Sequence, residues 1–416
     1  MKSLRVILHF NDENSHVVGK LFLSELTGKY HFEYDTSFVG TGLEISPVNL
    51  ALSGKSYEAQ RNADFYDLHG VFADSLPDDW GRKVQDLEFY KIGINDPAAI
   101  DRLAFVGRYG IGALRYEPAQ EFEEGKKIIS LADLRKATQK ILAGSFENVT
   151  DELLRSGGSA GGMRPKFLVD LDVKNLGTIR YTRGLPEKHF YPVVIKTPSK
   201  DGDHYQRTEY VYSAMAKKCG IALPDTYLLI GDKSKRAFFV IKRFDVLENG
   251  DRLHVHTYAG LQGLNFREGS PDYSELFRSV QELTRDHSQV VEAYRRMVFN
   301  YLGYNNDDHA KNFSFTMDKA CRWKLSPAYD MGYSPGRQGF HTMSINGIRK
   351  NATVRDFEKM AENFNVIEWK DIVKKTCSCL MEWDAIAGKS GVSVKHKNIV
   401  SQRIQENVKR IKKGFP

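Results

Sequence analysis

The sequence predicts an α+β protein with a small strand-rich N-terminal part and an all-helical C-terminal lobe. Residues 2–10 alternate as a strand, and two similar runs follow after polar turns, which indicates a small antiparallel meander. Beyond residue 270 the apolar side chains recur at the spacing of amphipathic helices. From these changes we expect three domains, at residues 1–120, 130–250 and 251–416.

The first of these domains continues with shorter elements. Residues 48–54 could add a strand, and residues 69–93 are predicted to be helical with an interruption at Pro77. A helix and a strand that ends at Pro118 follow. The polar residues 119–130 are expected to form the linker to the second domain.

The second domain mixes helices and strands. Helices are predicted from residue 130 and from Thr150, and an amphipathic helix over residues 205–220 should end at Gly220. The runs GTIRYTRG and FYPVVIKTPS are predicted strands, and TYLLIGD should pair with RAFFVIKRFDV. In the third domain the expected helices are YSELFRSVQEL, QVVEAYRRMVFNYLGY and residues 353–363, 368–383 and 395–412.

The composition indicates a globular protein without a membrane segment. Of the 416 residues, 41% are hydrophobic and 27% charged, which is ordinary for a soluble protein. No apolar run approaches the roughly 18 residues of a membrane helix, and the first residues lack the apolar core of a signal peptide. Four cysteines without zinc-ligand spacing favour the reduced cytoplasm. The net charge of +7 is compatible with ATP, RNA or DNA and identifies none of them.

The residues that carry chemistry concentrate in the stretch 305–330. Asp307 is followed five residues later by Asn312, and Asp330 lies 18 residues beyond it. Between them, NFSF and RWKLSPAYD predict a short hairpin. Protein kinases transfer phosphoryl groups with this arrangement, in which the first aspartate accepts the hydroxyl proton and the other two residues hold magnesium.

Other stretches could supply the remaining parts of a kinase. Four glycines within residues 157–162 could let the backbone approach phosphate, although a flexible loop would have the same composition. Lys196 ends an apolar strand and could contact phosphates, whereas most strand-end lysines reach solvent. Glu209, on the next helix, is the expected ion-pair partner of Lys196.

The loop at 305–312 allows a second interpretation. Asp307, Asp308, His309 and Asn312 could be a metal site or a plain polar loop. Zinc fits poorly because a lone histidine lacks soft partner ligands, and magnesium suits the oxygen ligands better. Lys311 could steady a transferring phosphate or lie at the surface, and His309 is expected to fix the loop backbone.

These motifs resemble the HipA-type serine/threonine kinases, the toxins of bacterial toxin–antitoxin pairs. Residues 71–82 and 101–118 are similar to the N-terminal subdomain of that family. SAGGMRPK resembles its phosphate loop, VIKTPS its lysine strand, VIKRFDV its hinge strand, and NDDHAKNF with LSPAYDM its catalytic and metal-binding motifs. The resemblance covers nearly the whole chain and implies a bilobal, protein-kinase-like fold.

The resemblance adds to the candidate site. The candidate catalytic residues are Asp307 and Lys311, and the candidate magnesium ligands are Asn312 and Asp330. The candidate ATP-site residues are Ser159, Ala160, Gly161, Gly162, Lys196, Glu209, Lys242, Phe244 and His309. Members of the family phosphorylate a serine of their own phosphate loop, which implies Ser159 here, with Ser156 as the second choice.

The resemblance also implies partners. These are a HipB-like helix-turn-helix antitoxin, operator DNA bound through the antitoxin complex, and a protein substrate such as an aminoacyl-tRNA synthetase. The basic stretch SVKHKNIVSQRIQENVKRIKKG is expected to be a solvated helix face, with an auxiliary DNA contact as the alternative.

Two other classes of function stay open at this stage. A kinase of the same fold could act on a lipid or small molecule, because phosphoinositide kinases have a similar loop. The chain could instead be an inactive, kinase-like DNA-binding regulator. The complete set of Asp307, Asn312 and Asp330 argues against an inactive kinase.

Overall fold

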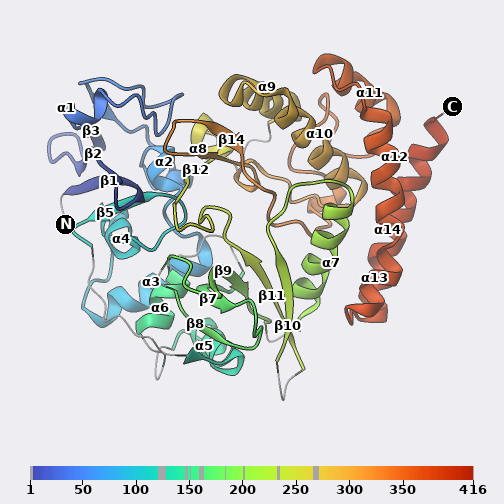
Figure 1. Cartoon of the computed structure of the whole chain (residues 1–416), viewed down its shortest axis with the longest axis horizontal. Helices are drawn as coiled ribbons and strands as arrows, with labels where there is room; N and C mark the ends of the chain where they lie inside the picture. Colours follow the sequence, from blue (N-terminus) through green and yellow to red (C-terminus); the bar gives the residue numbers. More distant parts are fainter. Residues whose placement is uncertain are drawn as a thin grey trace. The chain divides into compact units, whose positions relative to one another are not determined.

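The chain folds into two compact units, each built from segments that are distant in sequence (Figure 1). The computed structural model describes residues 3–119, 128–145, 149, 151–158, 164–182, 184–199, 202–231, 235–265 and 271–415. The first unit comprises Met1–Asp203, Leu229–Asn265 and Thr316–Arg322, and the second comprises His204–Leu228, Phe266–Phe315 and Trp323–Pro416. The three domains expected from the sequence remain a prediction.

An antiparallel five-stranded sheet, in the order β4-β3-β2-β1-β5, belongs to the first unit. The predicted meander is confirmed as β1 to β3. β2 and β3 approach so closely that a Cβ at Gly19 would lie 2.0 Å from the carbonyl oxygen of Glu33. The strands are β1 (Ser3–Asn11), β2 (Asn14–Leu23), β3 (Tyr30–Tyr34), β4 (Ser56–Glu58) and β5 (Leu114–Glu117).

The helices of the first unit mostly follow the predictions. The helix expected over residues 69–93 is confirmed with its interruption, since α2 precedes Pro77 and α3 follows it. The strand expected at 48–54 is wrong: Leu50 is buried but Val48 is 52% exposed, so these residues present no continuous apolar face to a sheet. The helices are α1 (Thr36–Val39), η1 (Ala63–Phe65), α2 (Gly70–Ala73), α3 (Asp79–Lys91), α4 (Ala99–Val106), α5 (Leu131–Leu142), α6 (Asp151–Gly158) and α8 (Tyr258–Gln262).

A second sheet has six strands in the order β10-β11-β9-β7-β8-β6. The chain passes from the second unit into the first within β10, and the predicted pairing of this strand with β11 is confirmed. Lys196, the last residue of β9, is paired with Lys166 on one side and Phe239 on the other. The strands are β6 (Ile128–Ile129), β7 (Lys166–Asp172), β8 (Ile179–Tyr181), β9 (Phe190–Lys196), β10 (Thr226–Ile230) and β11 (Ala237–Lys242), and β12 (His254–Thr257) follows.

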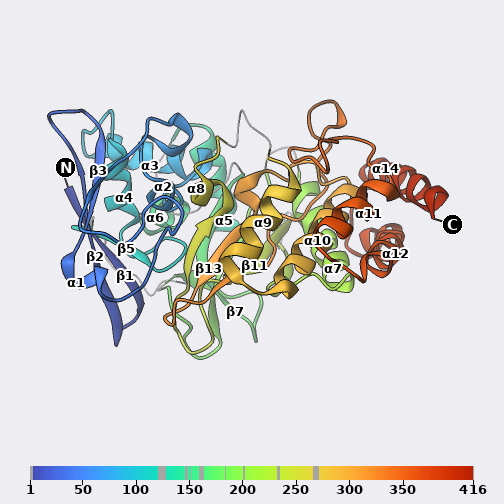
Figure 2. The ribbon, with the colours of Figure 1, turned by 90° about the horizontal axis from the view of Figure 1, so that it is seen from above.

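The second unit is built around α10, which is buried over most of its length. α9, α12 and α14 pack against α10, and Figures 1 and 2 show α11, α12 and α14 close together on one side of it. The helices are α7 (His204–Lys218), α9 (Tyr273–Thr284), α10 (His287–Leu302), η2 (Ala310–Asn312), η3 (Arg337–Gly339), α11 (Val354–Asn363), α12 (Trp369–Leu380), α13 (Trp383–Lys389) and α14 (Val394–Gly414). None of the helices within the described ranges is long and apolar enough to cross a membrane.

Two predictions for the C-terminal part need correction. Residues 251–416 are not all-helical, because they contain β12 and the predicted hairpin of β13 (Ser314–Met317) and β14 (Trp323–Leu325). The helix expected over 368–383 divides between α12 and α13. Trp383 is buried there and its indole N–H donates to the carbonyl of Lys397, 3.0 Å away. This contact with α14 is made by the first residue of α13, directly after the break.

Candidate active site

The predicted catalytic loop leaves α10 through a sharp turn. Tyr304 has a left-handed backbone with φ of 57°. The next residue, Asn305, is bonded to Asn300 of α10 twice, through backbone N–H to carbonyl and through the two side-chain amides, each at 2.9 Å. Ser334 donates to the Tyr304 carbonyl at 3.1 Å. The start of the loop is thus tied to α10 and to the segment that follows Asp330.

Asp307 and Asn312 face each other across this loop. The amide nitrogen of Asn312 donates to the backbone carbonyl of Asp307 at 2.7 Å. This bond fixes the amide orientation, so the side-chain oxygen of Asn312 is the atom suited to a metal ion. The Asp307 side chain is 64% exposed. A carboxylate in that position can reach a hydroxyl group on a molecule that arrives from solvent.

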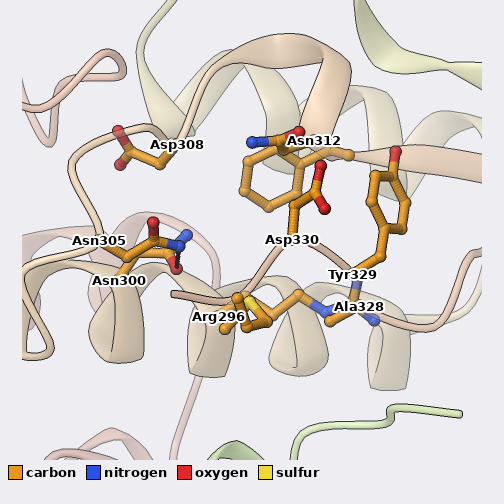
Figure 3. Close-up of a pocket in the computed structure, with 10 residues that line it drawn as sticks. Arg296, Asn300, Asn305, Asp308, Asn312, Ala328, Tyr329 and Asp330 are labelled. Carbon is orange, nitrogen blue, oxygen red and sulfur yellow. Dashed lines mark hydrogen bonds between the residues drawn. The ribbon is translucent and has the colours of Figure 1, made fainter. Parts of the chain in front are cut away.

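Asp330 lines the same small pocket as Asn312. Figure 3 shows its carboxylate pointing toward the Asn312 side chain. The backbone of Asp330 is left-handed, with φ of 53°. This conformation is uncommon outside glycine, and such strained residues cluster at functional sites. The structure therefore brings two of the predicted metal ligands together.

Asp308 differs from its neighbour Asp307, because its side chain is fully buried. Its Oδ1 accepts the backbone N–H groups of Thr342 at 2.8 Å and Met343 at 3.3 Å. Its Oδ2 accepts the hydroxyl of Tyr273 at 2.9 Å and lies 3.1 Å from Nδ1 of His341. Burial, with the Asp308 charge next in importance, raises the pKa of Tyr273 well above its usual value, so the phenol keeps its proton.

α10 supplies further residues of the pocket that the sequence reasoning missed. Arg296 and Asn300 lie four residues apart on α10 and both line it. Arg296 donates to Glu292 at 2.9 Å and to the Ser326 carbonyl at 2.7 Å. Burial lowers the pKa of Arg296, and the charge of Glu292 opposes that change. The available signal was a polar pair at this spacing on the helix that leads directly into the predicted catalytic loop.

Lys311 and His309 flank the candidate ligands. The carbonyl of Lys311 accepts the hydroxyl of Tyr329 at 2.8 Å, and its side chain is partly buried. The His309 side chain is 23% exposed, with Nε2 3.8 Å from Oδ1 of Asp307. The assignments of Lys311 to catalysis and of His309 to the ATP site stay predictions.

Lys196 and Glu209 belong to different units. Lys196 is 7% exposed, and its ammonium group lies 5.6 Å from the ring centroid of Phe239 on β11. Glu209 is buried on α7. The ion pair expected between Lys196 and Glu209 therefore stays a prediction.

The candidate hinge residues lie at and just after the end of β11. The ammonium group of Lys242 is 4.4 Å from the ring centroid of Tyr191 and 3.6 Å from a carboxylate oxygen of Glu248. Phe244 is partly buried two residues further on. Their assignment to the ATP site is still a prediction.

The two serine candidates differ in what the structure describes. Ser156 is buried in α6, and its hydroxyl donates to the carbonyl of Leu168 on β7. Phosphorylation of Ser156 would therefore require α6 to move. The remaining phosphate-loop candidates (Ser159, Ala160, Gly161 and Gly162) lie outside the described residues.

Asn312 and Asp330 are the residues of the pocket that could hold a metal ion. Within the described ranges no group of three or more His, Cys, Asp or Glu side chains could enclose a metal ion. Asn312 and Asp330 offer one amide and one carboxylate, both oxygen donors. Mg²⁺ is commonly held by one or two such groups, with water and substrate phosphates completing its octahedron.

The fold is mixed α/β, and its site combines an exposed carboxylate with an amide and a second carboxylate. Residues 13–117 match the family model described as the HipA N-terminal domain. Residues 158–386 match the model described as the HipA-like C-terminal domain, which is more than half of the chain. The chain therefore belongs to the HipA family, as the sequence motifs predicted.

Individual relatives agree with this membership. A Haemophilus influenzae protein named "Putative kinase" is 24% identical over 188 residues, and "Putative kinase Y4dM" of Sinorhizobium fredii is 27% identical over 170. The matches cover 42% and 38% of this chain and only 52% and 41% of those proteins. The structure of HipA from Shewanella oneidensis MR-1, solved with HipB and operator DNA, shares the fold. The two structures superpose with a TM-score of 0.70 and 14% sequence identity. The match covers 99% of this chain and 97% of the Shewanella chain.

Proposed function

We propose that this chain is a Mg-ATP-dependent serine/threonine protein kinase and the toxin of a bacterial toxin–antitoxin module. The observation that carries the proposal is the arrangement of Asp307, Asn312 and Asp330. Asp307 is exposed, its carbonyl holds the Asn312 amide, and Asn312 shares a pocket with Asp330. Kinase catalytic loops need one base directed at the substrate and two oxygen ligands directed at the metal.

Each residue has a distinct role in this proposal. Asp307 orients the substrate hydroxyl and accepts its proton as the phosphoryl group transfers. Asn312 and Asp330 hold the metal ion, and Lys196 and Lys311 place positive charge near the phosphates. Bound Mg²⁺ neutralises the negative charge of the transferring group.

Partners and substrates extend the proposal. The HipA structure solved with HipB and operator DNA supports an antitoxin that joins this chain to DNA. From the sequence resemblance, we propose that this antitoxin is a HipB-like helix-turn-helix protein. We propose a translation protein such as an aminoacyl-tRNA synthetase as the substrate. We further propose that Ser159, in the glycine-rich stretch, is the site of autophosphorylation.

The test is the intact mass of the protein after incubation with Mg-ATP, followed by peptide mapping. Wild type should gain one phosphate on Ser159, and Asp307→Ala should gain none. The control is Asp371→Ala, which removes an exposed carboxylate of α12 and should behave as wild type. A phosphate on the Asp307→Ala protein would contradict the assigned base.

A parallel assay separates the alternative functions. Lysate treated with protein and radiolabelled ATP should yield a labelled protein band with wild type only. Label in a lipid or small-molecule fraction would instead support the small-molecule kinase. No label in any fraction, combined with salt-sensitive DNA binding by the isolated chain, would support the inactive regulator.

A further inference from the structure

Two adjacent carboxylates of the loop face opposite environments. The Asp307 side chain is 64% exposed, whereas that of Asp308 is 0% exposed. Asp308 lines the pocket of Asn312 and Asp330, but both of its carboxylate oxygens already have partners within the chain. Its effect on Asp307 therefore runs through the backbone that the two residues share.

The hydrogen bonds of Asp308 join three parts of the second unit. Oδ1 accepts hydrogen bonds from the consecutive backbone N–H groups of Thr342 and Met343, at 2.8 and 3.3 Å. Oδ2 accepts a hydrogen bond from the hydroxyl of Tyr273, on α9, at 2.9 Å. The same oxygen lies 3.1 Å from Nδ1 of His341. A buried carboxylate is stable only when such donors surround it. Here the donors come from α9 and from residues 341–343, and the acceptor belongs to the loop.

The network continues back to the start of the loop. Asn300 of α10 donates to the Tyr273 hydroxyl at 3.0 Å, and the Asn305 amide donates to the Asn300 side chain at 2.9 Å. His341 stacks on Tyr301, with ring centroids 3.7 Å apart and planes 2° from parallel. The backbone on both sides of Asp307 is thus fixed by buried side chains.

We propose that Asp308 is a positioning residue, which holds Asp307 in its catalytic place only while residues 341–343 are docked against the loop. This inference rests on the proposed kinase function for its consequence, but its geometry does not. Asp308 spans the loop and the segment 341–343, so neither can shift without breaking the bonds of one carboxylate. Docking of that segment would therefore control the activity of the loop.

Asp308→Asn tests this role, because asparagine keeps the shape and loses the charge and two acceptor sites. The matched control is Asp272→Asn. Asp272 is a half-buried carboxylate that caps α9 and accepts from Ser344 and Gly347, at 2.7 and 2.8 Å, without touching the loop. Asp272→Asn loses bonds to Ser344 and Gly347, just beyond the segment 341–343. Only Asp308→Asn loses the bonds that join that segment to the loop.

Hydrogen exchange of the full-length chain gives a readout that needs no substrate. In Asp308→Asn the peptide covering residues 305–313 should exchange about tenfold faster than in wild type, as expected for loss of about 1.4 kcal/mol of local protection. In Asp272→Asn that peptide should exchange as in wild type. Equal exchange of residues 305–313 in wild type and Asp308→Asn would overturn the proposal.

Kinetics supply the second readout. Turnover by Asp308→Asn should fall about 100-fold, because displacing a catalytic base by about 1 Å slows the reaction by about that factor. The KM for ATP should stay within about twofold of the wild-type value. Asp272→Asn should keep wild-type turnover within about twofold. A similar loss of turnover in both variants would reduce Asp308 to a purely structural residue. Absence of phosphate transfer by wild type would count against the proposed function alone, since the exchange result stands without it.

Discussion

Tyr329 donates its hydroxyl to the backbone carbonyl of Lys311, with the two oxygens 2.8 Å apart. These residues directly precede the two candidate metal ligands, because Asn312 follows Lys311 and Asp330 follows Tyr329. The bond therefore fastens two segments at the point where an amide and a carboxylate must meet. The hydroxyl of Ser314, on β13, forms a hydrogen bond with the same Tyr329 hydroxyl, with the two oxygens 2.6 Å apart.

Tyr329→Phe should lower the affinity of the site for magnesium without unfolding the protein. The variant removes one hydroxyl that bonds to Lys311 and Ser314. Loss of about 1 kcal/mol of positioning energy would raise the Mg²⁺ concentration for half-maximal turnover about fivefold. A magnesium titration of ATP turnover measures this shift. An unchanged titration curve would show that the bond does not align the ligands.

Asp307→Asn and Asp330→Asn should have different kinetic signatures. Loss of a general base costs about 10²–10⁴-fold in turnover, so Asp307→Asn should lose turnover while it binds Mg-ATP as wild type does. Asp330→Asn should weaken Mg-ATP binding as well, because one metal ligand loses its charge. Calorimetric titration with a non-hydrolysable ATP analogue measures the affinities. Equal affinity of wild type and Asp330→Asn would contradict its role as a ligand.

The sequence predicted the helices well where local pattern decided them. α7, α9 and α10 lie where the apolar spacing placed them, and the β13–β14 hairpin lies between Asn312 and Asp330 as expected. The prediction of a strand at residues 48–54 was wrong, because an apolar run forms a strand only where a neighbouring strand is available to pair with it.

Part of the candidate site was predictable, because the spacing of its residues is a local feature of the sequence. The spacing of Asp307, Asn312 and Asp330 indicated their chemistry, and the structure shows Asn312 and Asp330 in one pocket. The burial of Asp308 could not be predicted, because its partners Tyr273 and His341 are more than 30 positions away in sequence. The spacing to Asn312 selected Asp307 as the candidate base, and the folded chain adds that Asp308 is buried among these distant partners.

Asp74→Ala should destabilise the first unit. The Asp74 carboxylate accepts from Nδ1 of His256, from the backbone N–H of Thr257 and from its hydroxyl, each at 2.7 Å. Nε2 of His256 is 3.0 Å from the Ser46 hydroxyl, but Ser46 is 1% exposed, so this Ser-His-Asp series is structural. Removal of the carboxylate leaves three donors of buried His256 and partly buried Thr257 unsatisfied, and it should cost about 3 kcal/mol.

Urea denaturation followed by tryptophan fluorescence measures that loss. Asp96→Ala is the control, because Asp96 is exposed between α3 and α4. Its free energy of unfolding should stay within about 0.5 kcal/mol of wild type. A loss that small in Asp74→Ala would show that water replaces the carboxylate at no cost.

The stability of the first unit should fall with acid, and His254 should contribute to the slope. Burial, aided by the neighbouring His256, lowers the pKa of His254 to about 3, whereas an unfolded histidine titrates at about 6.5. Below pH ~6.5 the unfolded chain therefore binds a proton that the folded chain does not, so stability declines as pH falls toward 3. Each such proton contributes about 1.4 kcal/mol per pH unit.

His254→Gln should reduce the slope of the unfolding free energy against pH between pH 6 and 4.5. The reduction should correspond to about one proton fewer taken up on unfolding, whatever the variant does to stability at pH 7. The control is His287→Gln, which replaces an exposed histidine at the start of α10 in the second unit. Urea denaturation at several pH values gives both slopes. If His254→Gln kept the wild-type slope, His254 would have to take up its proton in the folded state, and its pocket would have to admit water.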